Sequence, residues 1–159
     1  MRAPLVSIIT PVYNAAASLQ RMFASLAAQS LTDWEHVVVI DGASDGSAAV
    51  AKAAAARDAR IRVIEQANAG ASTARNTGLA DARGRWILFL DADDTIARDH
   101  LKQLVARGEA DSDIVCAGYL RRDADGRVVA RYNAPRGLAE DPFRTIVPLS
   151  RVSDWPLFQ

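Results

Sequence analysis

The chain has 159 residues, half of them hydrophobic and about a quarter charged, as in an ordinary soluble globular domain. Lys plus Arg and Asp plus Glu both number 19, and this zero net charge argues against a nucleic-acid-binding protein with its usual basic excess. No apolar run approaches the roughly 18 residues that a transmembrane helix needs, and a single cysteine excludes an internal disulfide and a CxxC site.

The N-terminal segment lacks the pattern of a signal peptide. Its apolar stretch begins at Leu5 and is closed by Pro11, which suits a buried strand better than a leader. We therefore expect the protein to reside in the cytoplasm.

Four short apolar runs, rich in β-branched residues, are typical of strands covered on both faces. They span residues 5–10, 36–40, 61–64 and 86–90. The intervening and following segments have helical character, over residues 15–29, 45–57, 72–82 and 99–107. Ser44 or Asp45 is available as the N-cap of the second helix. Strand alternating with helix predicts βαβ crossovers, and therefore an α/β fold with a mainly parallel sheet.

The later part of the chain changes character. A fifth strand is expected over residues 113–118, where Cys116 suits a small core residue better than a nucleophile. The sequence Asp123-Ala124-Asp125-Gly126, between two short runs, predicts the turn of a small antiparallel hairpin after residue 118. Beyond Tyr132 the periodic pattern is weak.

Polar residues follow each of the first four expected strands. In an open α/β sheet, ligands bind where the carboxyl ends of the strands meet, so these segments should converge on one edge of the sheet. They are residues 10–14, 41–47, 66–70 and 91–94.

The strongest chemical signal is Asp91-Ala92-Asp93-Asp94. Three carboxylates in four residues repel one another, so the cluster favours a bound cation. Mg²⁺ and Mn²⁺ take carboxylate oxygens and keep positions open for phosphate, and such an ion would stabilise a diphosphate leaving group. The alternative is a solvated acidic loop in which Asp93 or Asp94 caps a helix.

Two further residues point to a nucleotide. Asp41 follows a strand, where its carboxylate could accept the imide N–H of a pyrimidine base, although an Asp-Gly pair also forms simple turns. Arg75 lies in the first turns of a helix after Gly70, where the helix dipole disfavours a cation, so a ligand would explain it. The alternative is an ordinary surface arginine. His36 and His100 have no metal-ligand spacing.

These motifs, in this order, resemble the inverting glycosyltransferase family 2, whose members have the GT-A fold. The resemblance rests on five segments. They are Val6–Asn14, Gln29–Glu35, the Asp-Gly-Ala-Ser-Asp-Gly-Ser loop at 41–47, Asn68–Gly78 with its Ala-Arg-Asn-x-Gly ending, and the Asp-x-Asp motif in Asp91–Asp94. The resemblance covers roughly residues 5–118. We expect a nucleotide-sugar-binding domain over residues 1–118 and a short acceptor-side extension of the same domain over residues 119–159.

The resemblance also implies roles for single residues. Thr10, Pro11 and Tyr13 would line the nucleoside pocket, and Asp41 would read the base. Arg75 would lie near the base or the phosphates. Asp91 would face the ribose or the metal, and Asp93 would be the main ligand of Mg²⁺ or Mn²⁺.

The implied reaction moves a sugar from a nucleotide-diphosphate donor, expected to be a UDP-sugar, to a hydroxyl of a glycan, lipid-linked or protein acceptor. Such a protein would serve polysaccharide biosynthesis, with peripheral association at the inner face of the membrane in place of a transmembrane segment.

The catalytic base is not identified by the sequence. An inverting, in-line displacement needs a base that deprotonates the acceptor hydroxyl, and the family carries it in a later segment, often in a Glu-Asp pair. Glu140-Asp141 comes nearest but lies earlier than expected, and Asp154 is a further candidate. Ile40 also stands where many members have an acidic residue.

Two alternatives stay open at this point. An apolar strand followed by Asp-x-Asp-x-Thr at 91–95 also begins phosphohydrolases of the haloacid dehalogenase type, although Lys102 is too close to serve as their downstream lysine. The other alternative is a truncated, non-catalytic domain that binds a nucleotide sugar without transferring it.

Overall fold

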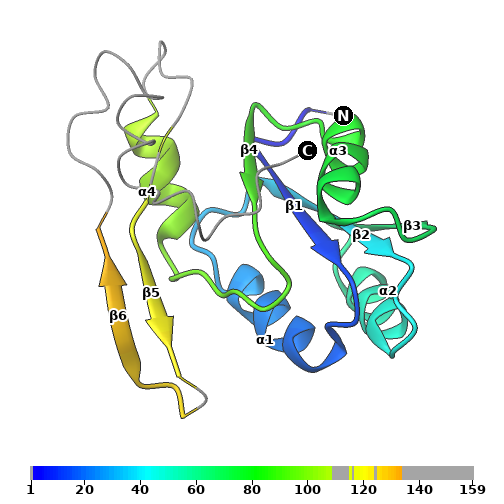
Figure 1. The fold of residues 1–159 in the computed structure, drawn as a ribbon. Coiled ribbons are helices and arrows are strands. Elements are labelled where there is room, and N and C mark those ends of the chain that lie inside the picture. The colour runs from blue at the N-terminus through cyan, green and yellow to red at the C-terminus, as the bar shows by residue number, and fades with distance from the viewer. Residues whose placement is uncertain (1, 109–114, 116, 124, 134–159) are drawn as a thin grey trace. The chain divides into compact units, whose positions relative to one another are not determined.

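The computed structural model describes residues 2–108, 115, 117–123 and 125–133 (Figure 1). The chain divides into two compact units, Met1–Val105 and Ala106–Gln159, and each is described by itself. The expected domain boundary at residue 118 stays a prediction.

The first unit is built on a parallel sheet of four strands in the order β3-β2-β1-β4. The strands are β1 (Val6–Val12), β2 (Trp34–Asp41), β3 (Ile61–Gln66) and β4 (Trp86–Phe89). The four strands predicted from the apolar runs are therefore confirmed. Because all four run in the same direction, their carboxyl ends meet at one edge of the sheet.

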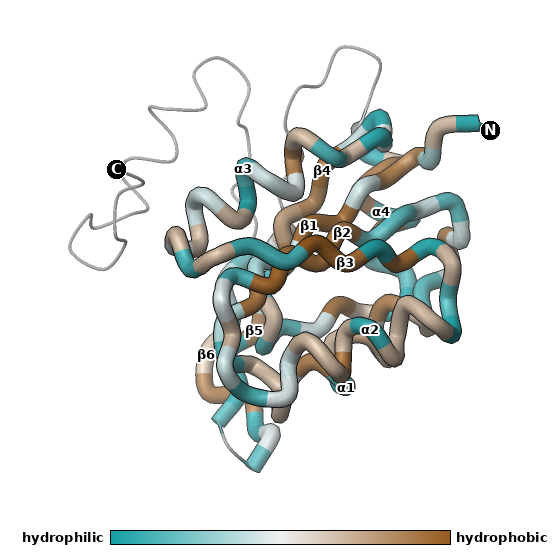
Figure 2. Tube along the Cα trace, turned by 90° about the vertical axis from the view of Figure 1, so that its right-hand side faces the viewer, coloured by the Kyte–Doolittle hydropathy of each residue, from teal (hydrophilic) through white to brown (hydrophobic). Residues whose placement is uncertain are grey.

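Helices cover both faces of this sheet, as Figure 2 shows with the sheet nearly edge-on. On one side lie α1 and α2, and α3 packs against β1 and β2 on the other side. The helices are α1 (Ala16–Ala27), α2 (Ser47–Arg57), α3 (Ala71–Asp81) and α4 (His100–Arg107). In α4, Leu101 is buried in the core on the side of α1.

The two central strands form the middle of the core. Every residue of β2 is buried, because helices cover both of its faces. On the α3 side the helix approaches closely: a Cβ at Gly78 would overlap the Cγ2 atom of Ile9 and lie 3.3 Å from that of Val39. Only glycine therefore allows α3 to pack at this distance from β1 and β2.

Strand β4 departs from the expectation that all four runs are buried on both faces. Ile87 and Phe89 are 38% and 48% exposed. They align with Ser7 and Ile9 of β1, on the face that α3 covers, but α3 packs over β1 and β2 and leaves β4 open. An apolar run indicates a strand, yet its place at the edge of the described sheet is a tertiary property that the run does not encode.

The described part of the second unit contains an antiparallel hairpin of β5 (Tyr119–Arg122) and β6 (Val128–Tyr132). The predicted turn is confirmed, since the Gly126 amide donates to the Asp123 carbonyl at 3.0 Å and Gly126 has a φ of 80°. The expected fifth strand over 113–118 and Cys116 fall largely outside the described residues. Of the helices in the described ranges, none is long and apolar enough to cross a membrane.

Candidate functional site

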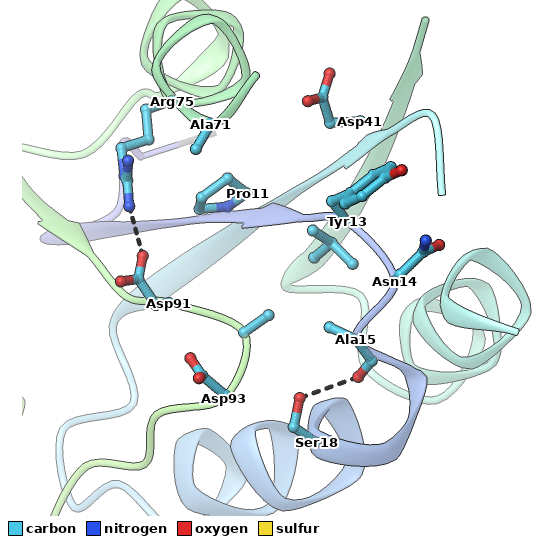
Figure 3. Close-up of a pocket in the computed structure, with 12 residues that line it drawn as sticks. Pro11, Tyr13, Asn14, Ala15, Ser18, Asp41, Ala71, Arg75, Asp91 and Asp93 are labelled. Atoms are coloured by element: carbon cyan, nitrogen blue, oxygen red, sulfur yellow. Dashed lines mark hydrogen bonds and ion pairs between the residues drawn. The ribbon is translucent and has the colours of Figure 1, made fainter. Parts of the chain in front are cut away.

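A pocket of about 430 Å³ lies at the carboxyl ends of β1, β2 and β4 (Figure 3). This volume is within the range of small-molecule sites. The loop after β1, the end of β2, the first turns of α3 and the loop after β4 all contribute to it. The lining residues are Pro11, Val12, Tyr13, Asn14, Ala15, Ser18, Asp41, Ala71, Arg75, Asp91, Ala92 and Asp93.

Pro11 lines the pocket, whereas the preceding Thr10 does not. The Thr10 side chain is fully buried on the α1 side of the sheet, where its hydroxyl lies 2.8 Å from Nε2 of His36. Successive side chains of a strand point to opposite faces, so adjacent residues of one motif separate into core and pocket. A direct contact of the Thr10 side chain with a nucleoside therefore has no support here.

Tyr13 and Asn14 form the rim of the pocket after β1. The Tyr13 side chain is exposed, and Asn14 has a φ of 48°, a conformation that Asn tolerates better than most residues. The Asn14 Oδ1 atom accepts from the backbone amides of Ser44 and Asp45, at 2.9 and 3.3 Å. Asn14 was absent from the predicted site residues; its position after a strand, in a turn-forming residue type, was the available signal.

Asp45 fixes the beginnings of two helices beside this rim. Its carboxylate accepts from the backbone amides of Ala16 at 3.0 Å and Ser47 at 2.9 Å. The Ser47 hydroxyl, followed by these amides, lowers the pKa of the exposed Asp45 carboxyl. Neither Ser44 nor Asp45 is the N-cap of α2, because Gly46 takes that position. The Asp45 carboxylate nevertheless accepts a hydrogen bond from the amide of Ser47, the first residue of α2, although Asp45 lies one residue before the N-cap.

Asp41, the last residue of β2, is buried but lines the pocket with its carboxylate. Oδ1 accepts from Nε2 of Gln66 at 2.8 Å and from the amide of Ala69 at 2.9 Å. Oδ2 accepts from the amide of Gly70, also at 2.9 Å. All three donors are neutral, so the carboxylate has no cationic partner among these hydrogen bonds.

The loop after β4 presents two carboxylates to the pocket. The Asp94 amide donates to the Asp91 carbonyl at 3.1 Å, which closes a turn, and Ala92 is buried in the core. With Ala92 held inward, Asp91 and Asp93 both line the pocket (Figure 3). Partial burial, followed by the negative charges of Asp93 and Asp91, raises the pKa of the Asp94 carboxyl.

Arg75 of α3 reaches across the pocket to Asp91 (Figure 3). One of its terminal nitrogens lies 2.6 Å from Oδ1 of Asp91, and the side chains are 21% and 53% exposed. Arg75 is therefore partly buried and paired, and its contact with a ligand stays a prediction beside the alternative of an ordinary surface arginine. A cation early in α3 is explained by the carboxylate opposite it, which compensates for its unfavourable place in the helix dipole.

Within the described ranges, no group of three or more His, Cys, Asp or Glu side chains is arranged to hold a metal ion. Of the three carboxylates that line the pocket, Asp91 and Asp93 lie together on the loop after β4, and Asp91 is paired with Arg75. Mg²⁺ sites commonly use one or two carboxylates and complete their shell with water and substrate phosphates. The donor set therefore suits a cation that binds together with a phosphorylated ligand.

A model of the family described as Glycosyl transferase family 2 matches residues 7–152. The chain belongs to this family. Its sequence is 45% identical over 125 residues to the uncharacterized glycosyltransferase EpsJ of Bacillus subtilis. The matched region covers 78% of this chain and 36% of EpsJ. It is 37% identical over 141 residues to the putative teichuronic acid biosynthesis glycosyltransferase TuaG of the same organism, covering 87% of this chain and 56% of TuaG.

Solved structures of glycosyltransferases share the fold. S. aureus TarS 1–349 in complex with UDP-GlcNAc has a TM-score of 0.60 at 32% identity, over 64% of this chain and 30% of TarS 1–349. The mannosyltransferase PcManGT from Pyrobaculum calidifontis, in complex with GDP-Man and Mn²⁺, has a TM-score of 0.60 at 28% identity, over 66% of this chain and 32% of its own. The expected GT-A architecture is confirmed.

Family membership decides between the two enzyme classes that the Asp91 motif suggested, and the phosphohydrolase alternative is wrong. The chain spans about a third to just over half of the length of EpsJ and TuaG. The candidates for the catalytic base, Glu140, Asp141 and Asp154, lie outside the described residues.

Proposed function

We propose that this family 2 chain binds the donor of a glycosyl transfer, in which a sugar moves from a nucleotide diphosphate to an acceptor hydroxyl. The observation that carries the proposal is the pocket at the carboxyl edge of the sheet. It combines a carboxylate at the end of β2, a cation on α3 and two carboxylates after β4, from Asp41, Arg75, Asp91 and Asp93.

The base of the nucleotide would lie against Asp41, between Pro11 and Tyr13. An exposed aromatic ring beside a buried carboxylate can pack on a planar base while the carboxylate accepts one of its N–H groups. Uracil carries such an N–H at N3, which supports UDP as the nucleotide. The UDP-GlcNAc bound to TarS is consistent with this choice.

The diphosphate would lie between Arg75 and the carboxylates of Asp91 and Asp93. These residues would hold a divalent cation, Mg²⁺ or Mn²⁺, together with the phosphate oxygens, as the Mn²⁺ and GDP-Man bound to PcManGT suggest by analogy. The chemistry that such an ion supplies is stabilisation of the negative charge on the departing nucleotide. The Arg75 guanidinium would contribute a fixed positive charge to the same phosphates.

Completed transfer further requires a base for the acceptor hydroxyl, for which Glu140, Asp141 and Asp154 stay candidates. The acceptor is proposed to be a glycan, lipid-linked or protein hydroxyl. Polysaccharide biosynthesis is the most direct setting, because TuaG is described as a teichuronic acid biosynthesis glycosyltransferase. Peripheral association with the inner face of the membrane stays a prediction.

The proposal is tested by calorimetric titration of UDP into the protein, with Mn²⁺ or with a chelator. We expect Mn²⁺ to strengthen binding at least about tenfold, which corresponds to roughly 1.4 kcal/mol, and Asp93→Ala to abolish this gain. Asp99→Ala removes an exposed carboxylate outside the pocket lining and serves as the matched control. UDP binding that is independent of Mn²⁺ and unchanged by Asp93→Ala would contradict the proposed metal site.

A second measurement separates donor binding from catalysis. UDP-sugar that is bound in the presence of Mn²⁺ but is neither transferred nor hydrolysed would identify a non-catalytic binding domain. Release of UDP from the bound donor would instead support an active transferase.

A further inference from the structure

A chain of hydrogen bonds reaches Asp41 from α3 through β3. The hydroxyl of Thr77 lies 2.7 Å from Oε1 of Gln66, and Nε2 of Gln66 lies 2.8 Å from Oδ1 of Asp41. Thr77 and Gln66 do not line the pocket, and these two hydrogen bonds link them to it through Asp41. Both are partly buried, so water competes for these bonds less than at an exposed site.

Chemistry fixes the direction of this chain. An ionised carboxylate only accepts hydrogen bonds, so the amide nitrogen of Gln66, and not its oxygen, must face Asp41. The oxygen of Gln66 then faces Thr77, whose hydroxyl has to be the donor. The opposite orientation of the amide would place two acceptors at 2.8 Å. Thr77 therefore orients Gln66, and Gln66 in turn orients the carboxylate.

Counting the hydrogen bonds that Asp41 accepts shows which acceptor position is left for a ligand. A carboxylate offers about four acceptor positions, two on each oxygen. Oδ1 accepts from Gln66 and from the Ala69 amide, which fills it, whereas Oδ2 accepts from the Gly70 amide alone among the described hydrogen bonds. One position on Oδ2 stays available, on a residue that lines the pocket.

We propose that Gln66 and Thr77 are positioning residues that make the pocket selective for a base with an N–H donor, and so favour uracil over cytosine. The inference rests on the proposed nucleotide site. Uracil presents an N–H at N3, whereas cytosine presents an acceptor at that position and would meet the carboxylate with a repulsive contact. A fixed Asp41 turns this difference into selectivity; a carboxylate free to rotate about its broad χ2 torsion discriminates less.

The test compares UDP and CDP affinities, in the presence of Mn²⁺, for wild type and variants well below their melting temperatures. In Gln66→Met, which keeps the length of the side chain and removes the donor, UDP should bind about tenfold more weakly with little change for CDP. Thr77→Val should lower UDP affinity about threefold, and Thr77→Ser, which restores the hydroxyl, should bind UDP like wild type.

Two further variants serve as a change of base preference and as a control. Asp41→Asn can donate an amide hydrogen to N3 of cytosine, so its preference for UDP over CDP should vanish or reverse. Glu65→Gln changes the neighbouring residue of β3, whose carboxylate pairs with Lys52 of α2 on the other face, and should leave both affinities unchanged.

The outcomes separate this inference from the proposed function. Wild-type protein that binds neither nucleotide would overturn both. Wild-type protein that prefers UDP, together with a Gln66→Met variant that keeps the same UDP-to-CDP ratio, would overturn only the positioning role. Equal losses for both nucleotides would assign Gln66 and Thr77 a purely structural part, since a structural defect does not discriminate between bases.

Discussion

Strand β2 carries a buried carboxylate near each end, and the two are satisfied in opposite ways. Glu35, near the amino end, accepts from the Ser7 hydroxyl at 2.6 Å and from the guanidinium groups of Arg83 and Arg62 at 2.6 and 3.1 Å. Asp41, at the carboxyl end, accepts only from neutral donors in its described hydrogen bonds. Both carboxylates lie on the face of the sheet that α3 covers.

The consequence is a closed site at one end and an open one at the other. Burial by itself would raise the pKa of Glu35, but its hydrogen bonds from Ser7 and Arg83, with the charge of Arg62, lower the pKa to about 2. Its charge is compensated and its oxygens are occupied. At the Asp41 end, neutral donors hold the carboxylate in its described hydrogen bonds, and one acceptor position faces a pocket. A buried carboxylate therefore has a structural role when protein cations and other donors occupy all its acceptor positions. It stays available to a ligand when neutral donors hold it and leave an acceptor position unoccupied.

Helix α3 connects the two ends. The amide of Gly70, just before its first turn, donates to Asp41, and the Arg83 amide, just past its last residue, donates to Glu35 at 2.7 Å. The segments at the two ends of α3 therefore hold both carboxylates. A substitution of Glu35, near the amino end of β2, tests whether the pocket at Asp41 is independent of the closed site.

The largest effect is expected for Glu35→Gln. The neutral amide removes the negative charge beside Arg83 and Arg62 and places an NH2 group where the surrounding donors need an acceptor. The free energy of unfolding should therefore fall by about 3 kcal/mol, although Arg62 keeps its pair with Asp81. Urea denaturation measures this change. Asp33→Asn, which breaks an exposed pair with Arg2, is the control and should cost less than about 0.5 kcal/mol. A loss below about 1 kcal/mol for Glu35→Gln would remove the contrast between the two ends, because structural saturation of Glu35 would then contribute little.

Acid should weaken the fold through His36, the neighbour of Glu35 on β2. Burial, against a smaller opposing effect of Asp58, lowers the pKa of His36 to about 3 from 6.5. The unfolded chain therefore binds this proton first, so stability is full above pH 6.5 and falls as the pH drops toward 3. The loss between pH 6.5 and 5 should be about 2 kcal/mol.

Glu35 acts in the same direction but in a lower range. Its pKa of about 2, against 4.5, makes its contribution full above pH 4.5 and lost as the pH falls toward 2. Denaturation at a series of pH values should show a weaker loss of stability from pH 6.5 to 5 for His36→Gln than for wild type. A smaller loss should remain in that variant, because burial also lowers the pKa of His100. A wild-type profile no steeper than that of His36→Gln would contradict the lowered pKa of His36.

The smallest effect is expected at the open end, for Asp94→Asn. Removing one of three neighbouring carboxylates relieves repulsion, so stability should rise by about 0.5 kcal/mol or less. Thermal melts without metal measure this gain. A clear loss of stability would mean that Asp94 makes a structural contact, and the β4 loop would then resemble the closed end more than the open one.

The sequence predicted the arrangement of elements because strand and helix patterns are local. The four apolar runs gave β1 to β4, the Ala-rich segment gave α2, and Asp123–Gly126 gave the hairpin turn. The exposed face of β4 was missed, because burial of an edge strand depends on which elements pack beside it. The cap of α2 was misplaced for a similar reason, since Asp45 also serves Ala16 of another helix.

The candidate site also has features that the sequence predicted and others that only the tertiary structure decided. By itself, the sequence determined that Pro11, Tyr13, Asp41, Asp91 and Asp93 lie at or just after the carboxyl ends of strands. In a parallel sheet these ends meet at one edge. Pairings between distant residues were decided only by the tertiary structure. It turned Thr10 toward His36, paired Arg75 with Asp91, and joined Thr77 to Asp41 through Gln66. Each of these contacts joins residues 11 to 26 positions apart, beyond the reach of any helix or strand period.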